Sequence, residues 1–392
     1  MKAYKFRLYP NKATSEKLQW VLDRCRELYN AALEERKEAY RMAGKSISLY
    51  DQQNDLPKLK TEIRPEYQEI GAHVLQNVLY RVDKAYKAFF RRVKNGEKPG
   101  HPRFKGKNWY DSFTYPDKAG WKLKDRMFTL SKIGTIRLIQ HREMQGKIKI
   151  CTIKREQDQW YVVFVCEVEA EKLPVSYEEV GIDLGITHFA ALSDGTFIDN
   201  PRHYRHAEKK LTKLQQALAR KKRGSHRRKK AVLAVAKAHR KIKNQRKDFQ
   251  HKASLQLVNR YQVIVFEDLQ STNMSKAPKP KQDERGKYLP NGAAAKAGLN
   301  KSIRDAGWGM FVQMVNAKAA SAGRKVICVN PYKTSQYCSG CGVEVKKDLS
   351  VRVHRCPDCG LEIDRDTNAA LNILSLGKKS LSAGTLPTPS KA

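Results

Sequence analysis

Apolar and polar residues follow helical and β patterns in turn along this chain. After a strand-like stretch at residues 3–9, apolar positions recur with a helical period over residues 18–33 and again over 74–89. Residues 127–169 then alternate or run apolar, as strands do. Because the N-terminal stretch has the same character, we expect it to join this later sheet. The helices then form an insertion between its strands, over residues 10–95.

The second half of the chain predicts a sheet flanked by helices. A short apolar strand ends at Asp183, two further strands follow it through Gly185 and a turn at Asp194 and Gly195, and the pattern is helical over residues 201–260. Two more apolar strands follow, at 261–269 and 324–331, and the first of them ends in a second acid, Glu267. Apolar strands separated by helices favour an α/β sheet.

The net charge of the chain indicates which class of partner it binds. The 77 Lys and Arg residues against 40 Asp and Glu give a net charge of +37, which favours salt-dependent binding to nucleic acid. Residues 201–260 hold 21 Lys or Arg and two acids, for a local net charge of +19, with a helical hairpin tip expected at Gly224 and Ser225. Basic residues at this tip are candidate contacts: Lys221, Lys222, Arg223, Arg227, Arg228, Lys229 and Lys230.

A second candidate surface lies at residues 94–116, where Lys and Arg alternate with Phe, Trp and Tyr between Gly and Pro. Cations for phosphates beside rings for bases are typical of nucleic-acid binding, and a solvated loop is the alternative. The candidate contacts are Arg103, Phe104 and Lys105. No apolar run approaches the roughly 18 residues of a membrane span, and the N-terminus lacks an apolar signal core. We therefore expect no membrane partner and a cytoplasmic location.

Four of the eight cysteines have metal-ligand spacing. Fourteen residues separate the pair Cys338 and Cys341 from the pair Cys356 and Cys359, and a glycine that allows a tight turn follows each pair. Four thiolates suit a closed tetrahedral zinc site with a structural role, and two disulfides are the alternative. The remaining cysteines are expected to be reduced and buried: Cys25, Cys151, Cys166 and Cys328.

Acids at strand ends suggest a second metal site. Buried carboxylates such as Asp183 and Glu267 are costly unless a charge or a metal ion compensates them. With one aspartate of the stretch DRD at 364–366 they would form a triad that can hold two Mg²⁺ ions about 4 Å apart for phosphodiester cleavage.

Helix geometry decides between the two aspartates of that stretch. Residues two apart on a helix point about 200° apart, so Asp364 and Asp366 cannot both face one site if the helix has begun at Asp364. We expect Asp366 to bind metal and Asp364 to cap the helix. An apolar stripe near the direction of Asp366 should pack on the sheet: Ala369, Ala370 and Ile373.

The order of these features resembles the RuvC branch of the RNase H-like fold. Several motifs, together with the cysteine segment before the last helix, make the chain to about residue 375 resemble the TnpB family. This family is transposon-encoded and is considered ancestral to the type V CRISPR effectors. The motifs are YKFRLYP, GHPRFK, GIDLG, VFEDL, NGAAAKAGLN, DAGW, TSQYCSGCG and CPDCG followed by DRDTNAALNI.

The resemblance implies an α/β multidomain protein that acts as an RNA-guided DNA endonuclease. Its partners would be a transposon-derived guide RNA and target double-stranded DNA, cut beside a short motif. Mg²⁺ would be bound by the catalytic residues Asp183, Glu267 and Asp366, and zinc by the four paired cysteines. Thr334 and Ser335 either line the nucleic-acid path or are ordinary turn residues.

The resemblance also implies a domain division. A β-barrel-like wedge domain would comprise 1–9 and 96–175, with a helical recognition unit at 10–95. A RuvC nuclease domain would span 176–374, with the basic insertion at 201–260 and a zinc ribbon at 334–360. We predict that the polar tail, 375–392, is disordered.

Three other functions are compatible with parts of the sequence. A strand-transferring transposase can use acids on the same fold, but no compact recognition helix is evident for transposon ends. A guided repressor that does not cut DNA would not need an intact triad. A plain zinc-ribbon nucleic-acid-binding protein accounts for the charge and the cysteines, and leaves the strand-end acids unexplained.

Overall fold

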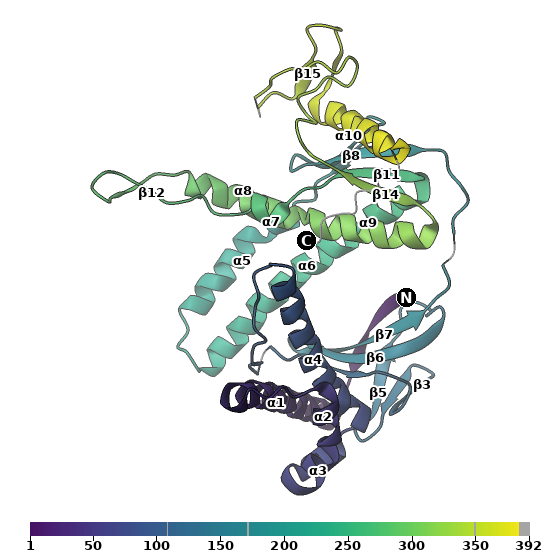
Figure 1. Cartoon of the computed structure of the whole chain (residues 1–392), viewed down its shortest axis with the longest axis vertical. Coiled ribbons are helices and arrows are strands. Elements are labelled where there is room, and N and C mark those ends of the chain that lie inside the picture. The colour runs from purple at the N-terminus through teal and green to yellow at the C-terminus, as the bar shows by residue number, and fades with distance from the viewer. Residues whose placement is uncertain (108, 171, 349, 384–392) are drawn as a thin grey trace. The chain divides into compact units, whose positions relative to one another are not determined.

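The computed structural model describes residues 1–392 except 108, 171, 349 and 384–392. The described chain divides into two compact units, residues 1–169 and 170–392. Figure 1 shows both units and labels many of their helices and strands.

The first unit contains a seven-stranded antiparallel sheet. Its strands are β1 (Lys2–Tyr9), β2 (Ser112–Tyr115), β3 (Trp121–Lys124), β4 (Met127–Leu130), β5 (Gly134–Ile139), β6 (Lys147–Glu156) and β7 (Gln159–Glu167). Their order in the sheet is β2-β6-β7-β1-β5-β4-β3. The N-terminal strand β1 lies between β7 and β5, so its predicted place in the sheet is confirmed. The edge strands β2 and β3 are not paired with each other in the described part of the chain, and barrel-like closure stays a prediction.

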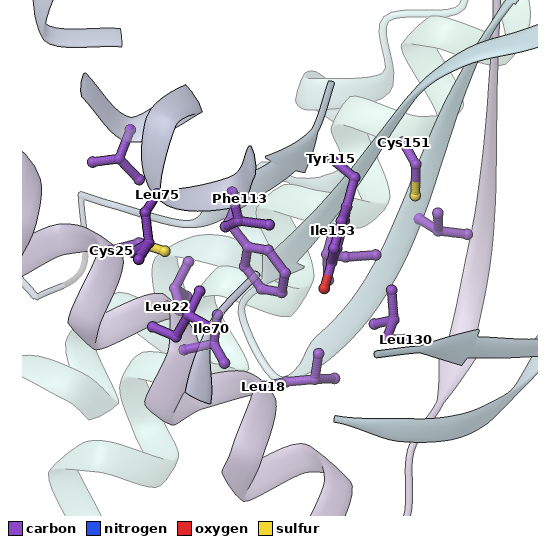
Figure 2. Close-up of a cluster of buried hydrophobic side chains, with 14 of the residues drawn as sticks. Leu18, Leu22, Cys25, Ile70, Leu75, Phe113, Tyr115, Leu130, Cys151 and Ile153 are labelled. Atoms are coloured by element: carbon purple, nitrogen blue, oxygen red, sulfur yellow. The ribbon is translucent and has the colours of Figure 1, made fainter. Parts of the chain in front are cut away.

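The helices of this unit lie between β1 and β2 in sequence and share one core with the sheet. They are α1 (Lys12–Ala43), α2 (Leu49–Asn54), α3 (Leu56–Lys58), η1 (Leu59–Ile63), η2 (Pro65–Glu69) and α4 (Ala72–Lys94). Figure 2 shows Leu18 and Cys25 of α1 and Leu75 of α4 among the side chains that pack with Phe113 and Ile153 of the strands. Burial of these apolar faces is what holds the helical insertion on the sheet.

The second unit contains a five-stranded mixed sheet. Its strands are β8 (Glu179–Leu184), β9 (His188–Leu192), β10 (Phe197–Asp199), β11 (Val263–Glu267) and β14 (Lys325–Val329), in the order β10-β9-β8-β11-β14. The strands β8, β11 and β14 run parallel to one another, and β9 is antiparallel to both of its neighbours, β8 and β10. These are the strands that the sequence predicted. Two small hairpins lie outside this sheet: β12 (Lys281–Gln282) with β13 (Tyr288–Leu289), and β15 (Val353–Arg355) with β16 (Glu362–Asp364).

Helices cover both faces of this sheet. The helices of the unit are α5 (His203–Ala219), α6 (His226–Arg260), α7 (Ser271–Met274), α8 (Ala293–Ala306), α9 (Trp308–Ala322) and α10 (Arg365–Ser382). Alternate residues of β11 point to opposite faces, as the pleat requires. Phe266 packs in the core with α6 and α9, and its ring centroid lies 6.0 Å from that of Phe311. Val265 packs with Ile373 of α10 on the other face. Figure 1 shows α9 and α10 on opposite sides of β8, β11 and β14.

Two glycines allow α10 to approach the sheet closely. A Cβ atom at Gly181 of β8 would lie 2.1 Å from the carbonyl oxygen of Ala370. A Cβ atom at Gly377 of α10 would lie 2.5 Å from Cγ2 of Val265 in β11. The absence of these side chains therefore sets the depth at which α10 rests on β8 and β11.

Helix α10 is longer than the sequence indicated. It continues to Ser382, so the prediction of disorder is wrong for residues 375–382. The polar stretch forms a helix because Gly377 rests on Val265 and the partly buried Leu381 packs against the core beneath α10. The rest of the predicted tail, 384–392, lies outside the described residues.

Candidate active site and metal centre

Asp183 and Glu267 lie side by side at the ends of two parallel strands. In the pairing of β8 with β11, Ile182 is opposite Phe266, and each acid is the next residue of its strand. Because parallel strands end at the same edge of a sheet, both carboxylates belong to one edge. Glu267 is 8% exposed. The sheet therefore brings together the two acids that the sequence singled out.

Asp366 reaches the same place from the first turn of α10. Asp364 precedes this helix as its N-cap, and its carboxylate accepts hydrogen bonds from the backbone N–H groups of Asp366 and Thr367 at 2.9 and 3.0 Å. The predicted capping role of Asp364 is confirmed. The stripe that was expected to pack on the sheet is also buried, which directs α10 onto it: Ala369, Ala370 and Ile373.

Two of the three carboxyl groups have raised pKa values. Burial, together with the negative charges of Glu267 and Asp366, raises the pKa of Asp183 to about 8. Burial also raises the pKa of Glu267. Placing these carboxylates together costs free energy, and a bound cation would reduce that cost. Carboxylate oxygens are ligands that suit Mg²⁺.

Two arginines neutralise Asp366. The guanidinium of Arg365 donates to its Oδ1 from Nη2 and Nε at 2.8 and 3.0 Å. Nη1 of Arg352 lies 3.7 Å from Oδ2 of the same carboxylate. Sequence reasoning assigned no role to either arginine, although Arg365 stands inside the DRD motif. The positive charge of Arg365 also lowers the pKa of Asp183 in part, so it lessens the repulsion among the acids.

The four paired cysteines form one compact group. Sγ of Cys338 lies 3.6 Å from that of Cys359, and Sγ of Cys341 lies 3.5 Å from that of Cys356. All four sulfur atoms lie within 4.8 Å of one another. Tetrahedral zinc with Zn–S distances near 2.3 Å requires sulfur atoms about 3.8 Å apart, so the group fits a zinc site. Among the described residues it is the only group of three or more His, Cys, Asp or Glu side chains close enough to hold one metal ion, and the three carboxylates do not form such a group.

The backbone around these cysteines forms two tight turns. Gly342 and Gly360 follow the pairs with φ values of 80° and 72°, which a side chain would strain. Their N–H groups donate to the carbonyl oxygens of Cys338 and Cys356 at 2.9 and 3.1 Å. The glycines thus have the conformation expected of them. The four remaining cysteines are buried, as predicted: Cys25, Cys151, Cys166 and Cys328.

The basic cluster lies at the tip of a helical hairpin, as predicted. Gly224 has a φ of 83°, and Ser225 caps the start of α6. Arg228 differs from its neighbours, because its Nη1 donates to the carbonyl oxygens of Leu218 and Lys221 at 3.1 and 2.9 Å and so holds the turn. The other basic side chains of the cluster are exposed: Lys221, Lys222, Arg223, Arg227, Lys229 and Lys230.

The aromatic and basic loop of the first unit is anchored to α1. The side chain of Asn30 donates to the carbonyl oxygen of Lys105 at 3.0 Å and accepts from its N–H at 2.7 Å. Arg103 and Phe104 are exposed, and the ring of Trp109 is 81% exposed. Trp109, which sequence reasoning did not single out, is the most exposed ring of this loop. An ordered loop that presents rings and cations can contact bases and phosphates.

Sequence reasoning missed the polar links between α10 and the cysteine segment. Asn368 Nδ2 donates to the carbonyl oxygen of Tyr337 at 2.7 Å, and its Oδ1 accepts from Ser339 N at 2.9 Å. Asn372, one turn later on the same face, donates to the carbonyl oxygens of Thr334 and Tyr337 at 2.9 and 2.8 Å. The spacing of four residues between the two asparagines was the available signal.

No helix in the described ranges is long and apolar enough to cross a membrane.

The fold and the site define an α/β protein with strand-end carboxylates and a four-thiol group that fits a zinc site. Three sequence families match it: one described as "Probable transposase" over residues 163–277, a "Cas12f1-like, TNB domain" over 308–373 and a "Helix-turn-helix domain" over 1–45. The chain belongs to the TnpB family of transposon-encoded proteins.

Relatives support this assignment over nearly the full length. The chain is 31% identical over 390 residues to "Putative RNA-guided DNA endonuclease InsQ" of Escherichia coli K12, covering 98% of this chain and 94% of that protein. It is 32% identical over 390 residues to "Putative RNA-guided DNA endonuclease" of Streptomyces pristinaespiralis, covering 98% and 91%. The solved mini-RNA-guided endonuclease CRISPR-Cas_phi3 has a TM-score of 0.50 at 10% identity, covering 96% of this chain and 92% of that one, and therefore shares the fold.

Proposed function

We propose that this protein is an RNA-guided DNA endonuclease of the RuvC type, encoded by a transposon. The observation that carries the proposal is the convergence of Asp183, Glu267 and Asp366 from β8, β11 and α10, where burial and mutual repulsion raise the pKa of Asp183 to about 8. Structural ion pairs also shift pKa values, but here burial and the charges of two neighbouring carboxylates act on an acid at a strand end, and a bound cation would relieve that cost. Two relatives that match nearly the whole chain are named putative RNA-guided DNA endonucleases, which favours nuclease chemistry.

In this proposal the three carboxylates hold two Mg²⁺ ions. When bound, Mg²⁺ supplies an activated water molecule and stabilises the leaving oxygen of the phosphodiester. The chain's own contribution is to fix the ligands: the two strands hold Asp183 and Glu267 in register, and the Asp364 cap fixes the first turn of α10 that carries Asp366. A bound Mg²⁺ would compete with the guanidinium of Arg365 for Oδ1 of Asp366.

Zinc at the four thiols would have a structural role. The cysteine segment connects β14 to α10 and is hydrogen-bonded to α10 through Asn368 and Asn372. Because a structural zinc site contributes folding free energy, metal binding there would help to place α10 on the sheet. In this proposal the zinc ribbon, 334–360, therefore positions the helix that carries Asp366.

The partners follow from charge and from the relatives. We propose that the basic hairpin of residues 201–260 binds the guide RNA or its heteroduplex. The unit that contains the wedge and recognition regions would bind the target DNA beside its short motif. Base pairing with the guide would then select the target sequence. The relevant compartment is the cytoplasm of a prokaryotic cell.

The proposal is tested with the purified full-length protein. RNA that co-purifies would be sequenced, and the complex would be incubated with a randomised double-stranded DNA library and Mg²⁺. We expect guide-dependent cuts beside a common short motif, and none with Asp366→Ala. A complex that carries a defined RNA but leaves every matched target intact would contradict the proposal and favour a non-cleaving guided repressor.

A transposase is the second candidate, because one matching family is described as "Probable transposase". That activity would join DNA ends without a guide. Strand-joining products from transposon ends, formed after the bound RNA is removed, would favour it over the guided nuclease.

A further inference from the structure

Thr334 connects the start of the cysteine segment to the strand-end acids. Its hydroxyl donates a hydrogen bond to Oε1 of Glu267. Thr334 is 4% exposed and Glu267 is 8% exposed, so water does not compete freely for this contact. The side chain therefore points to the acid cluster from a residue outside the triad.

The backbone of Thr334 is hydrogen-bonded as well as its side chain. Its carbonyl oxygen accepts a hydrogen bond of 2.9 Å from Nδ2 of Asn372 on α10. The same amide donates to the carbonyl oxygen of Tyr337, beside the first thiol pair, at 2.8 Å. Glu267 on β11, the cysteine segment and α10 are thus joined through one threonine whose hydroxyl and carbonyl are both used.

We infer that Thr334 is a positioning residue for Glu267, orienting this carboxylate as a metal ligand. The inference rests on the proposed function. Metal-binding carboxylates are oriented by hydrogen bonds from residues behind them, and losing such a partner typically weakens metal binding by about 10- to 100-fold. A hydroxyl is the feature that matters, since it donates a hydrogen bond to the carboxylate without adding a charge.

The alternative is that Thr334 serves only to build the turn before the cysteines. Valine and serine separate the two roles. Valine has nearly the shape of threonine and lacks the donor, whereas serine keeps the donor and lacks the methyl group. A purely structural role would follow shape, and a positioning role would follow the hydroxyl.

The test uses the full-length protein, freed of nucleic acid in high salt, with Mn²⁺ as the probe. Mn²⁺ affinity would be measured by electron paramagnetic resonance for the parent and for Thr334→Val, Thr334→Ser and Asp366→Ala, with zinc content and melting temperature recorded for each. We expect Thr334→Val to weaken Mn²⁺ binding by about tenfold or more with one zinc retained, and Thr334→Ser to stay within about twofold of the parent. Mg²⁺-dependent cleavage by the RNA complex should follow the same order.

The outcomes separate this inference from the function on which it rests. Parent-like Mn²⁺ affinity in Thr334→Val, while Asp366→Ala binds weakly, overturns the role of Thr334 and leaves the carboxylate site intact. Unchanged Mn²⁺ binding in Asp366→Ala removes the carboxylate metal site itself. If Thr334→Ser is as impaired as Thr334→Val, or if zinc is lost with Mn²⁺, Thr334 acts through folding and the inference is wrong.

Discussion

The carboxylate of Asp364 accepts a hydrogen bond of 2.9 Å from the backbone N–H of Asp366, so these two nearby aspartates have different tasks. Asp364 satisfies N–H groups that the first turn of a helix leaves unpaired. The carboxylate of Asp366 is directed elsewhere, to the guanidinium of Arg365 and to the cluster that contains Asp183. One short motif thus supplies both the start of the helix and a candidate metal ligand.

Substituting each aspartate should therefore give different defects. We expect Asp366→Ala to abolish DNA cleavage while guided DNA binding persists, because losing a metal ligand removes several kcal/mol of transition-state stabilisation. Asp364→Ala should cost about 1 kcal/mol of stability and leave measurable cutting, and Asp364→Asn, which keeps a cap acceptor, should cost less. Cleavage and binding assays on one RNA complex check both. Normal cutting by Asp366→Ala would refute the assignment of the active site.

Removing one thiol should affect the helix as well as the metal. Cys356→Ser is expected to release zinc and to increase hydrogen exchange along α10, because the cysteine segment is hydrogen-bonded to that helix through Asn368. Zinc is measured by elemental analysis and the helix by exchange over residues 365–382. Cys328→Ala is the matched control, since this buried cysteine lies in β14, outside the thiol group, and should keep the zinc. Full zinc occupancy in Cys356→Ser would argue against the site.

The exposed tip of the basic hairpin should set the salt dependence of RNA binding. Replacing Lys221, Lys222, Arg223 and Arg227 by Gln is expected to lower the slope of log affinity against log salt by about three to four. The control exchanges Lys and Arg at the same four positions, which keeps the charge and should keep the slope. Arg228 is left unchanged because it holds the turn. An unaltered slope in the Gln variant would place the RNA elsewhere.

The glycine contacts beneath α10 predict a steric penalty. Gly377→Ala would place a Cβ 2.5 Å from Val265 and should destabilise the protein by about 1–3 kcal/mol. Gly181→Ala should cost more, because it meets the backbone of Ala370, which cannot rotate away. Combining Gly377→Ala with Val265→Ala should recover part of the loss, as thermal or denaturant unfolding would show. Strictly additive effects would mean that the two side chains are not in conflict.

The acid cluster predicts an unusual dependence of stability on pH in Mg²⁺-free buffer. Asp183 has a folded-state pKa of about 8, above the roughly 3.9 of an unfolded aspartate, so the folded protein retains a proton that the unfolded chain has lost. Its contribution is fully present below about pH 4 and is lost as pH rises through about 8. Asp183→Asn should remove this dependence and raise stability at pH 8. Each pKa unit corresponds to about 1.4 kcal/mol, so even part of the shift is measurable.

Unfolding midpoints between pH 5 and 9, with zinc content verified, would test this. The same decline with pH in Asp183→Asn would show that another group is responsible. Added Mg²⁺ should flatten the curve of the parent protein and leave that of Asp183→Asn less affected.

The sequence by itself determined the local features of this protein. Periodicity predicted the strands that end in Asp183 and Glu267, because a buried face imposes its own spacing on the chain. Glycine placement predicted the turns at Gly342 and Gly360, and the thiol spacing predicted one four-ligand group, since a short chain has few ways to bring such ligands together. The preference of aspartate for helix N-caps sufficed to predict the role of Asp364, because the carboxylate and the N–H groups that it accepts from lie within one turn.

Only the tertiary structure decided the features that join distant residues. Thr334 lies against Glu267, 67 residues earlier in the chain, and no local pattern records that contact. The sequence placed Arg228 among the exposed cations of the hairpin tip. Its hydrogen bonds to the carbonyl oxygens of Leu218 and Lys221 exist only in the folded hairpin. The end of α10 was misplaced for the same reason: the composition beyond residue 375 is polar, but Gly377 rests on Val265 of another element. Burial against a distant strand, which composition does not record, stabilises that last part of the helix.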